Sequence, residues 1–256
     1  MLHATKGIVV HSLKYAETSL IVKIYTELFG IQSYLVRGIR KTGSKTKPGL
    51  FQPLTLLDLQ VYHREHASLQ TIREVRVAIP YQNIPFDIRK SSVAIFINEL
   101  IYKSIREEEP NPDMFSFLWD SCLELDSTEE SVAGFHIRFA IQMMHPLGIF
   151  PRLNHSAQNR YFNLREGLFQ PTIPESPEFL DAKESERMAK YLTLNPLDEK
   201  HLTPNPSPQG EGRASSGPSA KMEGNEVLET ILTYYRLHLP GFKNMKSHHI
   251  LHEVFK

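Results

Sequence analysis

Residues 54–62, LTLLDLQVY, decide the class of the N-terminal fold. From Thr55 onward the segment alternates so that Leu57, Leu59 and Val61 share one face, which is the pattern of a strand with one buried side. Four other short runs rich in β-branched and aromatic residues precede or follow it, at residues 8–10, 20–25, 34–36 and 69–77. Turn residues separate these runs, so the first 80 residues predict a small five-stranded antiparallel barrel.

After Pro80 and Pro85 the apolar residues recur with a helical period. The segment from Asp87 to Glu108 predicts an amphipathic helix that ends before Pro110. Further helices are expected over residues 112–125, 128–145, 177–194 and 226–238. The fold class is therefore α+β, with a barrel domain over residues 1–80 followed by an all-helical domain over residues 81–256.

Two segments interrupt the helical pattern. Residues 160–164 and 168–170 flank Glu166 and Gly167 and predict a small hairpin within residues 150–177. Residues 203–225 hold four Pro, four Gly and four Ser, and they contain no aliphatic core former. Such a segment buries too little surface to offset its ordering entropy, so we expect a disordered loop inserted in the helical domain; a domain linker is the alternative.

The net charge is zero, but the two halves differ strongly. Residues 1–80 hold 11 basic and 5 acidic residues, and residues 81–256 hold 18 basic and 24 acidic residues. The halves therefore carry charges of +6 and −6. This asymmetry indicates a basic module that binds an anionic polymer, joined to an acidic module with another role.

Several classes of protein are disfavoured. The single cysteine, Cys122, lies in an apolar run and can form neither an internal disulfide nor a cysteine-rich zinc site. No segment approaches the roughly 18 apolar residues of a membrane span, so a soluble, cytoplasmic protein is expected. His248 and His252 are four residues apart but lack the intervening Glu of a metalloprotease, and no catalytic motif stands out. We expect no enzyme activity, no metal and no cofactor.

The positive functional signal is the segment from Arg37 to Gly49, RGIRKTGSKTKPG, which has five cations and no acidic residue. It follows the third predicted strand, and small barrels bind single strands across one face and its bordering loops. Tyrosines near this face are candidates for base stacking, although each could instead be barrel core. The predicted DNA-binding residues are Arg37, Arg40, Lys41, Lys45, Lys47 and Tyr34, with Tyr15, Tyr25 and Tyr62 as further candidate aromatics.

Several segments, taken in order, resemble the RecO family of bacterial recombination mediators. They are GIVVHSLKYAETSLIVKIYTELFG (7–30), VRGIRK (36–41), GLFQPLTLLDLQVY (49–62), HIRFAIQMMHPLGIFPRL (136–153) and YYRLHLPGFKNMKS (234–247). The resemblance implies an N-terminal OB-fold and a non-enzymatic, nucleoid-associated mediator of DNA repair. Such a protein binds single- and double-stranded DNA and anneals complementary strands. With RecR it helps load RecA onto DNA coated by single-stranded-DNA-binding protein.

Many family members carry a zinc ribbon with two pairs of cysteines. In this sequence Ser156 and Asn159 stand where the first pair would fall, and Gln170 and Ile173 stand roughly where the second would fall. The resemblance therefore implies a zinc-less hairpin around Gly167.

The resemblance also implies that the helical domain docks the acidic C-terminal tail of single-stranded-DNA-binding protein. Arg138 would bind the tail, and Phe135, Phe139 and Met143 would line an apolar groove. The alternative is that the three apolar residues are core. A different function also remains open, namely an RNA-binding OB-fold protein that serves as a docking platform in RNA maturation. A metal-dependent nuclease is the third possibility.

Overall fold

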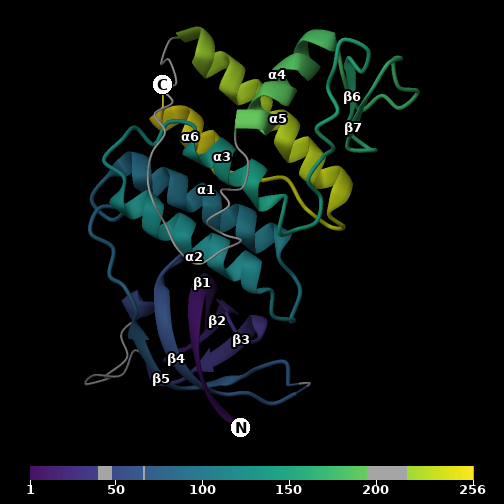
Figure 1. Ribbon diagram of the computed structural model, residues 1–256. Helices are drawn as coiled ribbons and strands as arrows, with labels where there is room; N and C mark the ends of the chain where they lie inside the picture. The colour runs from purple at the N-terminus through teal and green to yellow at the C-terminus, as the bar shows by residue number, and fades with distance from the viewer. Residues whose placement is uncertain (40–47, 66, 195–217, 256) are drawn as a thin grey trace, which may run out of the picture. The chain divides into compact units, whose positions relative to one another are not determined.

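The computed structural model describes residues 1–39, 48–65, 67–194 and 218–255, without the side chains of residues 218–223. Five strands form one antiparallel sheet in the order β3-β2-β1-β4-β5 (Figure 1). All five strands predicted from the sequence are present, and each extends or shifts by a few residues. They are β1 (Leu2–Ala16), β2 (Ser19–Thr26), β3 (Gly30–Val36), β4 (Leu56–Tyr62) and β5 (Thr71–Val77).

The sheet curls around an apolar core but is not a closed barrel. Its two edge strands, β3 and β5, approach through one isolated bridge between Tyr34 and Gln70. Gln70 N–H donates to Ser33 O at 2.8 Å, and Leu35 N–H donates to Gln70 O at 3.1 Å. Since β5 begins only at Thr71, this contact does not extend into a ladder. The predicted barrel is thus confirmed only as a curled five-stranded sheet. The enclosed core contains Val9, Leu20, Val22, Ile24, Tyr34, Val36, Phe51, Leu57, Leu59 and Val61.

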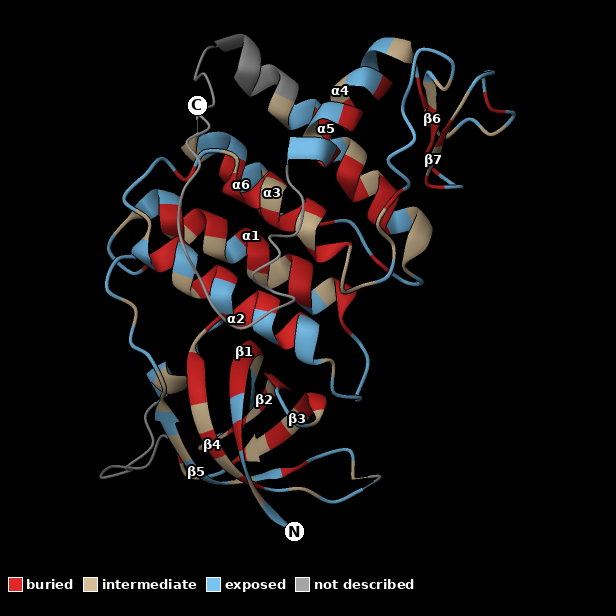
Figure 2. Cartoon of the chain, viewed as in Figure 1, coloured by how far each residue is buried: buried red, intermediate tan, exposed pale blue. Residues whose placement is uncertain are grey.

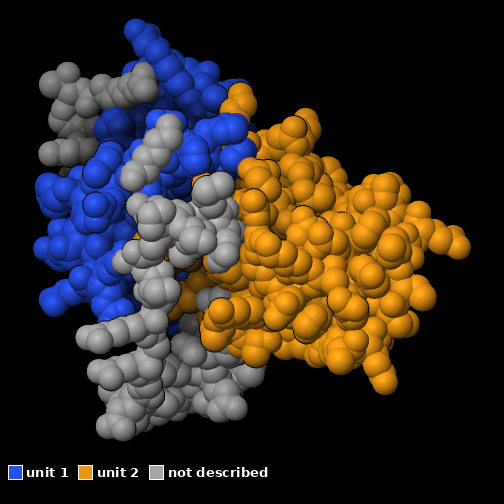
Figure 3. Space-filling model, turned by 90° about the horizontal axis from the view of Figure 1, so that it is seen from above, with its two compact units in different colours: residues 1–132, 247–256 blue, residues 133–246 orange. Residues whose placement is uncertain are grey.

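The chain divides into two compact units, residues 1–132 with 247–256 and residues 133–246 (Figure 3). The first unit adds four helical elements to the sheet: a 3-10 turn (Pro48–Phe51), α1 (Ile88–Ser104), α2 (Pro112–Ser127) and α6 (Ser247–Val254). Both α1 and α2 bury one side and expose the other (Figure 2).

The first unit extends past residue 80 because helix α2 packs on the outer face of the sheet. The Tyr25 ring stacks on Phe115 with centroids 6.2 Å apart, and the Tyr25 hydroxyl donates to Asn111 O at 3.5 Å. Residue 80, the predicted domain boundary, marks the change from strands to helices, whereas the compact units separate after Val132.

The second unit combines helices with a small three-stranded sheet of order β7-β6-β8. Its elements are α3 (Phe135–Met143), β6 (Tyr161–Asn163), β7 (Leu168–Gln170), β8 (Phe179–Leu180), α4 (Ala182–Leu194) and α5 (Pro218–His238). The predicted hairpin is confirmed as β6 and β7. The expectation of an otherwise all-helical domain is wrong, because the two-residue strand β8 pairs with β6; so short a strand leaves no sequence pattern.

Two predicted segment boundaries are corrected. The helix expected from residue 128 begins at Phe135, after Gly134 adopts a φ of 86° that a helix cannot contain. The loop expected over residues 203–225 is too long, because residues 218–225 belong to α5. Residues 203–217 lie outside the described residues. Within the described ranges, no helix has both the length and the apolar content needed to cross a bilayer.

Candidate nucleic-acid interface

Arg37 is exposed and directly follows β3, at the start of the basic segment. Ile39 N–H donates to Thr18 O at 3.0 Å, which fixes the beginning of this segment beside the turn between β1 and β2. The other predicted cations, Arg40, Lys41, Lys45 and Lys47, lie outside the described residues. Arg37 and the β1–β2 turn therefore share one end of the sheet.

The four candidate tyrosines divide into two groups. Tyr34 and Tyr25 are buried, with exposures of 0% and 2%, and burial raises the pKa of both hydroxyls. A base cannot stack on a ring enclosed in the core, so the prediction that Tyr34 contacts DNA is not supported by its position. Tyr15 and Tyr62 are 61% and 43% exposed. Of these two, Tyr15 lies toward the same end of the sheet as Arg37, since its neighbour Lys14 pairs with Leu20, which pairs with Val36.

A β-bulge in β1 determines which residues face outward at this end. Val9 pairs with Ile24, but His11 pairs with Lys23, so Val10 is an extra residue between two matched pairs. Because strand side chains alternate, one extra residue turns the rest of the strand over. The residues that it turns to the outer face of the sheet are His11 and Leu13. Tyr15 follows at a second irregularity, between Lys14 and Ala16, and is 61% exposed.

These residues form a continuous surface with their neighbours on β2 and β3. Leu13 pairs with Ile21, which pairs with Leu35, and Lys23 lies one pair further along. Leu13 is 55% exposed. We define the β1–β2–β3 face as His11, Leu13, Tyr15, Ile21, Lys23, Leu35 and Arg37. An apolar and aromatic centre with cations at its edges suits stacked bases flanked by phosphates.

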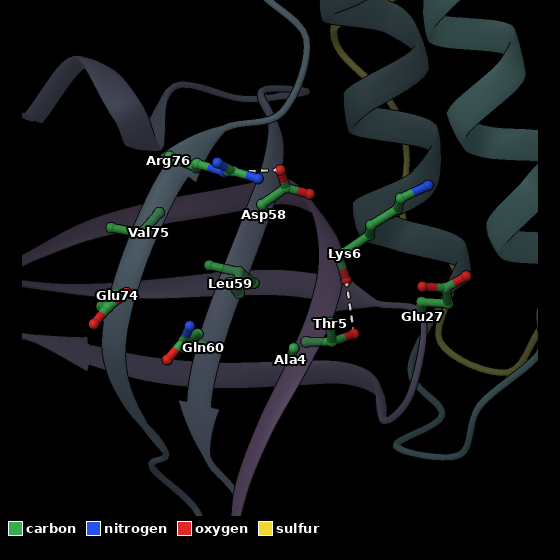
Figure 4. A pocket seen from close by; sticks show the side chains of 10 residues that line it. All are labelled: Ala4, Thr5, Lys6, Glu27, Asp58, Leu59, Gln60, Glu74, Val75 and Arg76. Atoms are coloured by element: carbon green, nitrogen blue, oxygen red, sulfur yellow. Dashed lines mark hydrogen bonds and ion pairs between the residues drawn. The ribbon is translucent and has the colours of Figure 1, made fainter.

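The rest of the outer face is either covered or mixed in charge. Trp119 of α2 lies over part of it, with the Lys6 ammonium 5.1 Å from the indole centroid. Beyond that contact lies a shallow pocket (Figure 4), in which Lys6, Asp58 and Arg76 are cross-strand neighbours. Arg76 Nε donates to Asp58 at 3.0 Å. Since carboxylates neutralise the cations here, this pocket favours a polyanion less than the β1–β2–β3 face does.

The residues predicted to bind the partner tail lie on α3 in the second unit. Phe135, Phe139 and Met143 are buried, with exposures of 8%, 2% and 0%. This burial agrees with the alternative that they are core. Arg138 is half-buried, and its guanidinium carbon lies 4.7 Å from the Phe135 ring centroid. Of the four residues, only Arg138 offers a polar group close to the surface.

The four positions aligned with family zinc ligands do not suit zinc. Ser156 Oγ accepts the N–H of Asn159 at 3.0 Å, and the Asn159 amide donates to Asn154 O. Gln170 bonds a backbone carbonyl, and Ile173 has no ligand atom. Zinc prefers thiolates and imidazoles, which none of these side chains provides. The described residues contain no group of three His, Cys, Asp or Glu that could hold a metal.

Aromatic packing and polar clamps hold the hairpin instead. Phe162 contacts Phe169 and Tyr234, with centroids 4.6 and 6.1 Å away. The Asn154 side chain both accepts from Phe169 N–H and donates to Phe169 O, at 2.9 and 2.8 Å. His238 Nε2 lies 2.8 Å from Leu164 O. These contacts give the hairpin a fixed position on α5 without using the four aligned residues.

Comparison with known proteins gives a consistent result over the whole chain. The family model "Recombination protein O N terminal" matches residues 1–81, and "Recombination protein O C terminal" matches residues 85–167. The chain is 36% identical to the DNA repair protein RecO of Bacteroides fragilis over 256 residues, which cover both chains fully. It is 33% identical to the RecO of Phocaeicola vulgatus over 255 residues, again covering both chains fully. It is also 33% identical to the RecO of Flavobacterium psychrophilum over 252 residues, with 98% of each chain covered.

Proposed function

The chain belongs to the recombination protein O family of DNA repair proteins, and from this membership we propose that it acts by holding DNA strands rather than by catalysing a reaction on them. It binds single- and double-stranded DNA and anneals complementary strands. With RecR, it helps RecA load onto DNA coated by single-stranded-DNA-binding protein. The observation that carries the DNA-binding part is the exposed β1–β2–β3 face, which ends at Arg37 beside the basic segment.

The chemistry of this face fits a single strand. Bases gain stacking and apolar contact on Tyr15 and Leu13, both more than half exposed. Arg37 and the four cations that follow it in the sequence supply positive charge that attracts the phosphates. The net charge of +6 over residues 1–80 draws the polyanion to this half of the chain.

The salt dependence of binding to labelled oligo-dT tests this proposal. Replacing Arg40, Lys41, Lys45 and Lys47 together by Ala removes up to four phosphate contacts, so the log–log salt slope should shrink by up to about 2.8. A matched control is Lys183→Ala, an exposed cation of α4 in the second unit. An unchanged slope in the quadruple variant would exclude the basic segment from the DNA-binding site.

We further propose that Arg138 binds the acidic C-terminal tail of single-stranded-DNA-binding protein. Residues 81–256 carry a net charge of −6, so an acidic peptide needs a local cation to dock there. Replacing Arg138 by Ala should weaken the free energy of binding of a tail peptide by about 2–5 kcal/mol. Binding of naked DNA should stay near wild type, and a thermal melt of the same variant shows whether it folds. Wild-type affinity for the peptide would place the tail site elsewhere.

An RNA-binding platform is the competing function, because cations that contact phosphate do not distinguish DNA from RNA. Annealing of complementary DNA strands, together with co-purification of RecR, supports the mediator function. Preferential binding of RNA with no annealing activity supports the platform. Incubation of labelled DNA with divalent metals would reveal a nuclease through shortened products.

A further inference from the structure

Three side chains meet where helix α1 reaches the β1–β2–β3 face. His11 and Lys23 are directly paired across β1 and β2. The ring of Tyr102 from α1 stacks on the His11 imidazole, with centroids 4.8 Å apart and planes 30° apart. The Lys23 ammonium lies 5.5 Å from the same Tyr102 centroid. One aromatic ring therefore holds two groups that can both carry positive charge.

The described part of the chain shows no carboxylate paired with these groups. Two titratable side chains face His11: Lys23, which is paired with it on β2, and Tyr102, which stacks on it from α1. One turn away on α1, Glu99 is paired with Lys103 at 3.2 Å. Neither His11 nor Lys23 forms an ion pair with a carboxylate in the part of the chain that the structure describes. A protonated His11 would lie opposite the Lys23 ammonium and be repelled by it, and an anion between the two groups would offset that repulsion.

The exposure of the site allows an anion to reach it. Tyr102 is 38% exposed, and His11 and Lys23 are both half-buried at the edge of the open surface. Leu13, the next outward residue of β1, is 55% exposed. A strand lying over Leu13 and Tyr15 would therefore pass directly over the His11–Lys23 pair.

We propose that His11 and Lys23 bind one backbone phosphate of a single nucleic-acid strand, that His11 takes up a proton as the phosphate binds, and that Tyr102 is the positioning residue for both. The inference rests on the proposed nucleic-acid binding and deepens it. It gives the strand a direction across the sheet, from Arg37 over the apolar centre to the end of the face beside α1.

The proposed proton uptake predicts the direction in which the affinity for a strand changes with pH. In the unbound protein, burial and the charge of Lys23 lower the pKa of His11, so the imidazole is neutral near neutral pH. A bound phosphate favours the charged imidazolium and raises that pKa. Affinity should therefore rise as the pH falls, by at most about tenfold per pH unit because one proton is involved.

The test measures fluorescence anisotropy of a labelled oligo-dT of about 15 nucleotides at several salt concentrations, at about pH 6 and about pH 8. Lys23→Gln should weaken binding and reduce the log–log salt slope by about 0.7. His11→Gln should bind like wild type at the higher pH and lose much of the gain at the lower pH. His155→Gln and Lys183→Gln, exposed positions of the second unit, are the matched controls.

Tyr102 is tested by a pair of variants. Tyr102→Phe keeps the ring and should retain the wild-type pH dependence, whereas Tyr102→Leu should lose it. Thermal melts accompany both variants. Rescue by Phe distinguishes positioning of His11 from a role of the hydroxyl.

The outcomes separate this inference from the proposed function. If Lys23→Gln keeps the wild-type salt slope, or if His11→Gln keeps the wild-type pH dependence, the phosphate site is overturned even though the strand still binds. The same measurement with oligo-U, an RNA strand, tests nucleic-acid binding in general. If the wild-type protein binds neither oligo-dT nor oligo-U, the proposed nucleic-acid binding is contradicted. Equal proton uptake with the two oligonucleotides is expected, because both present the same phosphate.

Discussion

The buried ammonium of Lys90 donates a hydrogen bond to the backbone carbonyl of Asp126 at 2.7 Å and another to Thr128 O at 2.7 Å. The carboxylate of Asp126 in turn accepts the backbone N–H groups of residues 82–84, at 2.8 to 2.9 Å. Asp126 thus joins three parts of the first unit: the connection after β5, the first turn of α1 and the end of α2. This joint holds α1 and α2 together with the segment that leads out of the sheet.

The first prediction concerns Asp126→Asn. Burial alone would raise the pKa of Asp126, but the three backbone donors and Lys90 outweigh it and hold that pKa below its usual value. In Asp126→Asn one accepting oxygen is replaced by an NH2 group, which is itself a donor and cannot accept the backbone N–H groups. The free energy of unfolding should therefore fall by about 2 kcal/mol. Urea unfolding followed by the fluorescence of Trp119, the single tryptophan, measures it. Glu129→Gln, an exposed position, is the control, and equal midpoints for the two variants would contradict the prediction.

A second prediction compares two glycines of the first unit. Gly30 has a φ of 59°, and a Cβ there would lie 2.3 Å from Glu109 O of the α1–α2 connection. Gly30→Ala should therefore destabilise the protein by at least about 2 kcal/mol, from backbone strain and from displacement of that connection. Gly49→Ala is the matched control, because a Cβ there has no atom within 4 Å. Chemical unfolding of the two variants should differ accordingly; similar stabilities would show that the connection moves without cost.

The sequence predicts the sheet well because its signals are local. In residues 55–62 the alternation of apolar and polar side chains follows the pleat, and the observed β4 has Leu57, Leu59 and Val61 buried as expected. Asp126, in contrast, resembles an exposed carboxylate on an amphipathic helix. Its three backbone partners lie more than 40 residues earlier in the chain, so no local pattern indicates them.

The candidate site is predictable only in part for the same reason. The cations after Val36 form a local run in the sequence, and this run predicts Arg37 as a DNA-binding residue. The outward turn of His11 depends on a bulge hidden in the continuous apolar run Ile8–Val10. Three apolar residues in succession, followed by polar alternation, are the one sequence signal that could have indicated it. The contact with Tyr102 comes from a helix about 90 residues away and has no such signal.

A third prediction concerns an exposed ion pair in the second unit. The Arg165 guanidinium donates to both Glu178 oxygens, at 2.9 and 3.0 Å, and Ser176 Oγ donates to the same carboxylate at 2.6 Å. Hydrogen bonds from Arg165 and then Ser176 lower the pKa of Glu178 to about 2. Arg165→Gln should move this pKa back toward the ordinary glutamate value. NMR titration of the side-chain carboxyl carbon checks it, and an unchanged pKa would mean that Arg165 does not set it.

A fourth prediction follows from His136, which is 9% exposed on α3. Burial lowers its pKa to about 4 from an ordinary value of 6.5. The unfolded chain therefore takes up a proton before the folded chain does, and stability should fall as the pH drops from about 6.5 to about 4, by up to about 3 kcal/mol. His136→Gln should lack this part of the loss in urea unfolding across that pH range. His155→Gln, an exposed histidine, should keep it. Parallel wild-type and His136→Gln curves would refute the prediction.

The last prediction uses Tyr15 and Tyr62, two exposed tyrosines at opposite ends of the sheet, as a matched pair. Tyr15 lies on the β1–β2–β3 face, whereas Tyr62 pairs with Leu2 at the opposite end of β1. Both are surface side chains, 61% and 43% exposed, so neither substitution removes core packing. If bases stack at the Arg37 end of the sheet, Tyr15→Leu should weaken binding of oligo-dT by about 1–3 kcal/mol. Tyr62→Leu should bind like wild type.

The same titration at high salt strengthens the comparison, because stacking depends on salt far less than phosphate contact does. The difference between Tyr15→Leu and wild type should therefore persist when the cation contribution is screened. A larger loss with Tyr62→Leu than with Tyr15→Leu would move the strand to the other end of the sheet, away from Arg37 and the basic segment. Equal losses would mean that both ends contact DNA, and the β1–β2–β3 face would no longer suffice as the site.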